Sequence, residues 1–320
     1  MLRGRANGAD GSILGNDSAR LTGAELRPSW IAQSERGQTL ALRLITWIAL
    51  TFGRSAARVL IYPICLYFLL FSVTARAASR KYLRKVLERE PLPAHLLRHY
   101  HAFAATILDR VFLLKGEYRR FEVRLHGQEI VDDIVRGGEG CLLLGAHIGS
   151  FEVTRTLATQ VRGLRVSMVM YEENARKMNA VLARLNPGAA LHVIPLGRMD
   201  SMLKVEDALA RGELVGILAD RTIAGEGTVT RRFLGEPAQF PVGPFRIAAM
   251  LKRPIILMFG LYLGGNRYDI HFERLADARG LERAQRDTFL DSAVSDYVSR
   301  LEHYCRLVPY NWFNFYDYWK

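Results

Sequence analysis

The chain has 320 residues, 49% of them hydrophobic, which excludes a largely disordered protein and allows one large domain or two small ones. The net charge of +12 is concentrated at one end, because residues 1–90 hold 14 Lys/Arg against 6 Asp/Glu and so carry +8 of the total. Three widely spaced cysteines, Cys65, Cys141 and Cys305, form neither a disulfide framework nor a zinc-binding spacing, which fits a reducing compartment.

The N-terminal region predicts an arm followed by a membrane segment. Residues 1–38 are polar and Gly-rich without a clear period, so we expect a flexible arm. Two apolar stretches follow, residues 44–52 and 59–73, separated by a segment that contains Arg54 and Arg58. Neither reaches the roughly 20 apolar residues that span a bilayer. Together they could form a tilted span, a shallow hairpin or an interfacial anchor, and the alternative is a buried amphipathic helix pair.

A basic helix is predicted directly after the apolar stretch. Its cations recur at intervals of four in two adjacent rows: Arg76, Arg80 and Arg84, and Lys81, Lys85 and Arg89. Each cation near an anionic membrane surface contributes about 1 kcal/mol, and the positive-inside tendency places such a helix on the cytoplasmic side. It could instead dock an acidic protein or form a solvated face. We expect no nucleic acid partner, because the charge lies beside an apolar segment and no recognised nucleic-acid-binding module is present. Residues 39–90 are therefore predicted to form an anchor and a basic juxtamembrane helix.

Residues 91–320 are predicted to form an α/β catalytic domain. A helix is expected over residues 92–115 and a long closing helix over residues 281–307. Between them, strands are expected at residues 121–125, 140–146, 164–171, 191–195, 214–219, 229–233, 254–263 and 267–272. Because helical stretches separate several of these strands, we expect a mostly parallel central sheet flanked by helices.

The most informative run is residues 141–152, an apolar strand that delivers His147 at its carboxyl end. A Gly149-Ser150 step can then open a helix that carries Glu152 in its first turn. A histidine that acts as a general base needs one free ring nitrogen and a carboxylate on the other, and Glu152 can supply that carboxylate. The simplest chemistry is direct attack on an activated acyl group by an acceptor hydroxyl or amine. The alternative is an ordinary hydrogen-bonded histidine at a strand end.

Other charged groups follow later strands. The strand at residues 216–219 ends on Asp220 and Arg221. Ligands of open parallel sheets collect beyond the carboxyl ends of the strands, so this pair could organise a pocket and hold phosphate or carboxylate, or simply form a surface ion pair. Arg176 lies in a polar helix start after the strand at residues 164–171. Residues 233–248 predict a Pro/Gly-patterned loop that enters an apolar helix, either to bind an anion or an acyl chain or as a plain turn.

The C-terminal end is aromatic: residues 312–319 contain six aromatic side chains. Tyr and Trp favour boundaries between apolar and polar surroundings. We expect this segment to pack beside an acyl channel, to lie at the membrane interface, or to act as a hydrophobic plug.

The chain resembles the bacterial lipid A biosynthesis (late) acyltransferases of the lysophospholipid acyltransferase superfamily over about residues 40–310. The resemblance lies in the order of four features: the apolar segment with its basic helix, and residues 144–152, 216–221 and 233–244. The resemblance implies an enzyme on the cytoplasmic face of the bacterial inner membrane. It would move a fatty acyl chain from acyl carrier protein or coenzyme A to a hydroxyl of a lipid or glycolipid, with no metal or other cofactor.

The resemblance also implies roles for single residues. His147 matches the catalytic base of the family's His-x4-Glu motif, Glu152 its partner, and Asp220 the acidic residue of the later motif. We expect the amides of Gly149 and Ser150 to stabilise the oxyanion. Substrate phosphate or carboxylate is expected at Arg221, with Arg176 as a second candidate.

One departure and two alternatives remain. The C-terminal end looks more like acyltransferases associated with aryl-polyene-type lipid clusters than like lipid A enzymes, which usually close with a Trp-rich segment followed by basic residues. A hydrolase with the same dyad and a non-catalytic membrane-binding protein are the alternative functions.

Overall fold

The computed structural model describes residues 35–162, 164–171, 192–196, 200–222 and 226–319. Most of the predicted N-terminal arm and the candidate Arg176 lie outside these residues.

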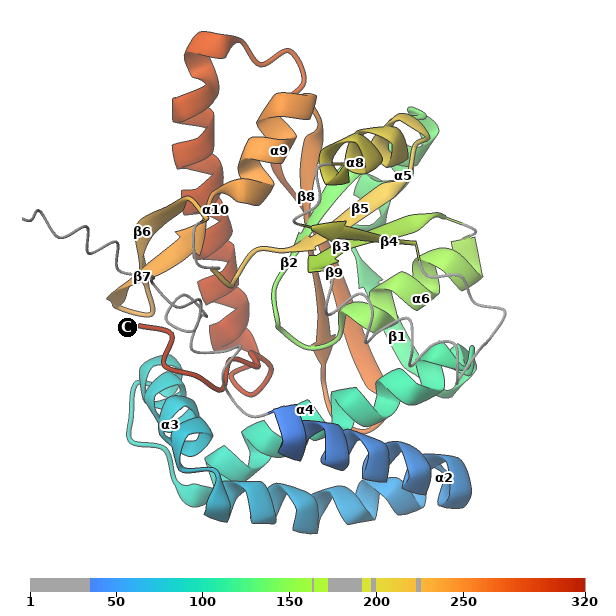
Figure 1. Ribbon diagram of the computed structural model, residues 1–320, viewed down its shortest axis with the longest axis vertical. Coiled ribbons are helices and arrows are strands. Elements are labelled where there is room, and N and C mark those ends of the chain that lie inside the picture. The colour runs from blue at the N-terminus through green and yellow to red at the C-terminus, as the bar shows by residue number, and fades with distance from the viewer. Residues whose placement is uncertain (1–34, 163, 172–191, 197–199, 223–225, 320) are drawn as a thin grey trace, which may run out of the picture.

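The centre of the molecule is a seven-stranded sheet in the order β1-β9-β8-β2-β5-β3-β4, and a separate hairpin is formed by β6 and β7 (Figure 1). The strands are β1 Glu122–His126, β2 Cys141–Gly145, β3 Val166–Tyr171, β4 Val193–Leu196, β5 Leu214–Leu218, β6 Thr228–Phe233, β7 Glu236–Pro241, β8 Pro254–Tyr262 and β9 Arg267–Asp277. All neighbouring pairs of the large sheet are parallel except β8 and β9. The predicted mostly parallel α/β sheet is confirmed.

The helices flank this sheet or gather at one end of it (Figure 1). They are α2 Glu35–Phe71, α3 Val73–Leu87, α4 Pro93–Leu114, α5 Gln128–Arg136, α6 Phe151–Arg162, α8 Ser201–Ala210, α9 Gly243–Leu251 and α10 Arg286–Leu307, with short 3-10 turns at Tyr118–Arg120 and Arg283–Gln285. The predicted helix over residues 92–115 is confirmed as α4, which begins with Pro93 in its first turn, where a missing N–H costs nothing.

Strand β2 lies in the middle of the sheet, between β8 and β5, and every residue of it is buried. Successive side chains of a strand point to opposite faces. Leu143 packs in the core beneath α5 and α6, whereas Leu142 and Leu144 belong to the larger core that includes α10. Because both faces are covered, the strand is a continuous apolar run rather than an alternating one.

One stretch differs from the sequence expectation. Residues 236–241 were expected to lie in a loop but form β7, which pairs antiparallel with β6. Pro237 and Pro241 made this segment look like a loop. In a two-stranded hairpin each strand has a free edge, where proline is tolerated because no ladder N–H is needed there.

Helix α2 joins both predicted apolar stretches, with a kink at Gly53, whose φ is 79°. One side packs with α4 in the core through Ala57, Ile61 and Cys65. Arg54 and Arg58 also face inward, since both lie within ion-pair distance of the buried Asp109 of α4. By length and composition, Thr51–Phe71 could cross a membrane, and 22% of its most apolar window is buried.

Candidate active site

His147 and Asp220 meet because two neighbouring parallel strands end side by side. Gly145 of β2 is in register with Leu218 of β5, and the two side chains follow two residues later on each chain. Nδ1 of His147 lies 2.7 Å from Oδ1 of Asp220, and the backbone N–H of His147 donates to Oδ2 at 3.0 Å. The sequence therefore predicted both strand ends correctly, and the structure adds that they touch.

Asp220 is held as an ionised acceptor. It is fully buried, and besides His147 it receives hydrogen bonds from Nε1 of Trp312 at 3.0 Å and Nδ2 of Asn314 at 2.9 Å. Burial raises the pKa of this carboxyl, but His147, Arg221 and the hydrogen bonds outweigh it and hold the pKa well below its usual range. A carboxylate on Nδ1 requires the proton there, which leaves Nε2 with a free lone pair.

The charge state of His147 suits a base. Its side chain is 29% exposed, and burial lowers its pKa below 6.5; the positive charge of Arg221 lowers it further, while Asp220 opposes both. The neutral imidazole therefore dominates near pH 7.

The aromatic C-terminal segment completes this site. The N–H of Phe313 donates to the carbonyl of His147 at 2.7 Å, and Gly149 donates to the carbonyl of Asn311 at 2.8 Å. Trp312 between them is fully buried and donates to Asp220. Sequence reasoning missed Trp312 and Asn314 as parts of the site. The available signal was the pair of asparagines at 311 and 314, which interrupt an otherwise aromatic segment.

A second buried histidine supports Trp312 from behind. Nε2 of His99 lies 2.8 Å from the carbonyl oxygen of Trp312. Because a carbonyl only accepts hydrogen bonds, Nε2 carries the ring proton, and Nδ1 accepts a hydrogen bond from the hydroxyl of Ser79 at 2.8 Å. Burial lowers the pKa of His99 to about 4, so the ring is neutral. A chain of contacts thus runs from α3 through α4 and the C-terminal segment to Asp220.

The sequence profile of the family described as bacterial lipid A biosynthesis acyltransferase matches residues 42–314. The chain belongs to this family. It is an acyltransferase, and the resemblance drawn from its motifs is confirmed. No curated protein matches the chain.

Glu152 of the acyltransferase was expected to hydrogen-bond His147, but its contacts among the described residues are with two arginines. It lies in the first turn of α6 and is buried, but Nε of Arg155 donates to it at 2.6 Å and Nε of Arg110 lies 3.3 Å from its other oxygen. A side chain three residues ahead on a helix is its natural neighbour, and Arg155 occupies that position. Asp220 therefore replaces Glu152 as the carboxylate on Nδ1 of His147.

The amides of Gly149 and Ser150 are already hydrogen-bonded. Gly149 donates to Asn311, and Ser150 donates to the carbonyl of Gly260 at 2.7 Å. This differs from the expected oxyanion site, because Ile148 and Gly149 form isolated β-bridges with Trp312 and Gly260 before α6 begins. Glycine is required at position 149 by the backbone instead. Its φ is 59°, and a Cβ there would lie 1.9 Å from the carbonyl oxygen of Gly260.

Arg221 binds the C-terminal segment. Its Nε donates to Oδ1 of Asn314 at 2.7 Å, its Nη2 donates to the carbonyl of Phe313 at 3.0 Å, and its guanidinium lies over the ring of Tyr316. The structure therefore brings together His147, Asp220 and Arg221, with Arg221 fixing the segment that donates to Asp220.

Within the described residues, one group has the composition of a metal site: His126, Asp269 and His271, whose ligand atoms lie within 4.8 Å of one another. It lies on β1 and β9, separated from β2 by β8. The rings of His126 and His271 stack with centroids 4.3 Å apart and planes 8° apart. The strand β8 keeps this group apart from His147 and Asp220.

Proposed function

We propose that this acyltransferase moves a fatty acyl chain from a thioester to a hydroxyl of a lipid or glycolipid, with His147 as general base and Asp220 as the residue that orients it. The contact that carries the proposal is the one between Nδ1 of His147 and the buried Asp220. Asp220 also accepts hydrogen bonds from the side chains of Trp312 and Asn314. Family membership supports acyl transfer to a lipid, and coenzyme A and acyl carrier protein are both candidate donors.

The proposed reaction is a single displacement. Nε2 of His147 takes the proton of the acceptor hydroxyl as its oxygen attacks the thioester carbonyl. The tetrahedral intermediate then expels the thiolate, which takes the proton back from the imidazolium, so that an ester and a free thiol are the products. Asp220 stabilises the transient imidazolium. General-base catalysis of this kind contributes about 10²- to 10⁴-fold.

We assign supporting roles to the other charged residues. Arg221 positions the C-terminal segment, since it contacts Asn314 and the carbonyl of Phe313. Glu152 fixes Arg110 and Arg155 beside α6, and we propose that its role is mainly to stabilise this part of the fold. A cavity of about 230 Å³ under α6, lined mainly by apolar side chains that include Phe151, offers space for part of an acyl chain.

We further propose that the enzyme lies on the cytoplasmic face of the inner membrane through one side of α2. That side, with the residues that follow it, exposes apolar side chains: Phe52, Val59, Leu60, Tyr62, Leu66, Tyr67, Leu70, Phe71 and Val73. An exposed apolar stripe on a helix that is docked along its other side suits the membrane interface.

We propose that the basic helix α3 contributes less to this attachment than its sequence predicted. Lys81 pairs with Asp317, Lys85 with Glu236, and Arg84 with Glu90. Arg76 donates to the carbonyls of Leu69 and Leu70 at the end of α2. The three ion pairs offset part of the positive charge of the helix, so we propose that apolar burial rather than charge provides most of the attachment.

The test is mass spectrometry of products from the purified full chain in lipid–detergent micelles. The enzyme is given acyl carrier protein and coenzyme A thioesters and a panel of hydroxyl-bearing lipids. We expect an acylated lipid from the wild type, at least a hundredfold less from His147→Ala, and an unchanged yield from His303→Ala, an exposed histidine of α10. Free fatty acid as the only product would favour the hydrolase, and full transfer by folded His147→Ala would refute the assignment of the base.

A further inference from the structure

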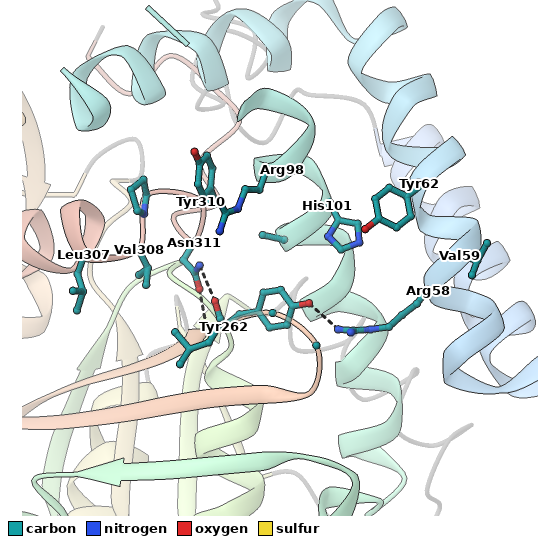
Figure 2. A pocket seen from close by; sticks show the side chains of 15 residues that line it. Arg58, Val59, Tyr62, Arg98, His101, Tyr262, Leu307, Val308, Tyr310 and Asn311 are labelled. Atoms are coloured by element: carbon teal, nitrogen blue, oxygen red, sulfur yellow. Dashed lines mark hydrogen bonds between the residues drawn. The ribbon is translucent and has the colours of Figure 1, made fainter. Parts of the chain in front are cut away.

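A cavity of about 750 Å³ lies apart from the residues that surround Asp220, and it borders the exposed side of α2. Figure 2 shows its walls, to which α2 contributes Arg58 and Tyr62 and α4 contributes Arg98 and His101 among others. Residues 262–265, from the end of β8, and residues 307–311, from the end of α10 onward, provide the remainder. We call it the α2 cavity. None of the residues assigned above to the chemistry lines it.

The walls carry positive charge without a matching negative one. Arg58 and Arg98 are among the fifteen lining residues, none of which is Asp or Glu. The nearest carboxylate to Arg58 is Asp109 at 3.5 Å, but Arg54 shares that carboxylate at 2.8 Å. Two guanidinium groups therefore face one negative charge, and this corner of the cavity keeps an excess of about one positive charge.

Arg58 also retains hydrogen-bonding capacity. Its Nη2 donates to the hydroxyl of Tyr262 at 2.7 Å (Figure 2), whereas its buried Nε has no hydrogen-bond partner among the described residues. A buried donor without a partner costs free energy comparable to a lost hydrogen bond. Because Nε is buried, the donor left for a ligand in the cavity is Nη1, which makes no hydrogen bond to a described residue.

The opposite wall offers a second guanidinium and polar ring edges. Arg98 is exposed and lies with its guanidinium 4.4 Å from the ring centroid of Tyr310, while His101 stacks on Tyr62 at 4.5 Å. Arginines recognise phosphate and carboxylate through paired N–H donors, and an aromatic ring holds a guanidinium flat without using those donors. Each of the two arginines can therefore bind an oxyanion from its own wall of the cavity.

The cavity also borders apolar surface. Val59 and Tyr62 line it and are 69% and 55% exposed, and they belong to the apolar stripe of α2. A ligand that satisfies both regions has an anionic head and hydrocarbon chains. Asn311 connects the cavity to the active site, because it lines the cavity and accepts the N–H of Gly149 through its carbonyl.

We propose that the α2 cavity binds the uncapped phosphate (phosphomonoester) headgroup of a lipid, whose chains lie along the exposed side of α2. Arg58 and Arg98 contact the phosphate, and Tyr62, His101 and Tyr310 form the walls around it. The inference concerns binding alone and does not require the transfer reaction proposed above.

The test is equilibrium binding by titration calorimetry on the full chain in a non-ionic detergent. The ligands are dioctanoyl phosphatidic acid, dioctanoyl phosphatidylcholine and inorganic phosphate. We expect saturable binding of phosphatidic acid at least tenfold tighter than that of either other ligand, because only it combines chains with an uncapped phosphate. Loss of one charged hydrogen-bond donor in Arg98→Gln should weaken it about tenfold. Arg283→Gln, an exposed arginine beside α10, is the matched control and should bind as the wild type does.

Two further variants keep the test decisive. Arg58→Gln should also weaken binding, with a melting curve to check folding because Arg58 contacts Asp109. His147→Ala should bind normally, so that failure of the transfer proposal leaves this result unaffected. The proposal is overturned if phosphatidylcholine binds equally well, if inorganic phosphate alone binds as tightly as phosphatidic acid, or if Arg98→Gln binds like the control.

Discussion

The docking of α2 depends on one buried carboxylate, and Asp109→Asn tests it. Asp109 lies in α4 with its side chain fully buried. It accepts hydrogen bonds from Nε and Nη2 of Arg54 at 2.8 and 3.1 Å and from the hydroxyl of Tyr268 at 2.9 Å. Nη2 of Arg58 lies 3.5 Å from the same carboxylate. Asparagine keeps the size of the side chain but removes the charge, and its amide N–H groups face guanidinium donors.

The expected loss follows from the burial of the partners. Removing one member of a buried ion pair costs about 3–5 kcal/mol. The side chains of Arg54 and Arg58 remain 15% and 20% exposed, so water can hydrate them in part, and we expect the lower end, about 3 kcal/mol. That corresponds to roughly a hundredfold shift in the equilibrium between docked and undocked α2.

Pulse proteolysis across a urea series, with the full chain in detergent, measures this shift. Cleavage should appear first within α2, at lower urea than in the wild type. Asp133→Asn is the matched control, because Asp133 is exposed and its ion pairs with Arg136 and Arg274 lie on the surface, where such pairs contribute about 0–1 kcal/mol. If Asp109→Asn is no more sensitive than Asp133→Asn, the ion pairs do not hold α2 in place.

Three further predictions concern the site and its support. Gly149→Ala should prevent folding, because the new Cβ would meet the carbonyl oxygen of Gly260, whereas Gly138→Ala, with φ of 68° but open space around it, should cost only about 1–2 kcal/mol in a thermal melt. Between pH 6.5 and about 4, His99 is protonated in the unfolded state but not in the folded state. The free energy of unfolding should therefore fall by up to about 1.4 kcal/mol per pH unit as the pH drops, and His99→Gln should flatten that slope. The acid limb of kcat/KM against pH should have its midpoint below 6.5, because burial lowers the pKa of His147 in the free enzyme, and a midpoint above 6.5 would contradict the assignment.

The fold followed from local patterns in the sequence. The apolar run that became β2 is buried on both faces, and such runs separated by helical stretches predict a parallel sheet. The rule that ligands collect beyond the carboxyl ends of strands brought His147 and Asp220 to the same edge before their contact was known. β7 was missed because its prolines are compatible with a strand only at a free edge, and edges are a property of the assembled sheet.

The hydrogen-bond partners of the site residues could not be predicted from the sequence in the same way. A spacing of five residues places Glu152 in the first turn of α6 but does not fix where its side chain points, and Arg110 comes from a helix about forty residues earlier. Trp312 and Asn314 reach Asp220 only because the C-terminal segment folds back beside His147. These contacts join residues more than ninety positions apart, which a single sequence does not reveal.

The most direct test of the account compares the transfer rates of Asp220→Asn and Glu152→Gln at saturating substrate, with each rate expressed per folded enzyme. We expect Asp220→Asn to lose about 10²- to 10⁴-fold in kcat, because His147 loses the group that fixes its tautomer. Glu152→Gln should mainly lower the melting temperature, since it leaves Arg110 and Arg155 without their carboxylate, and should keep kcat within about tenfold of the wild type. The opposite order, with Glu152→Gln inactive and Asp220→Asn close to the wild type, would contradict the account and make Glu152 the residue that orients His147.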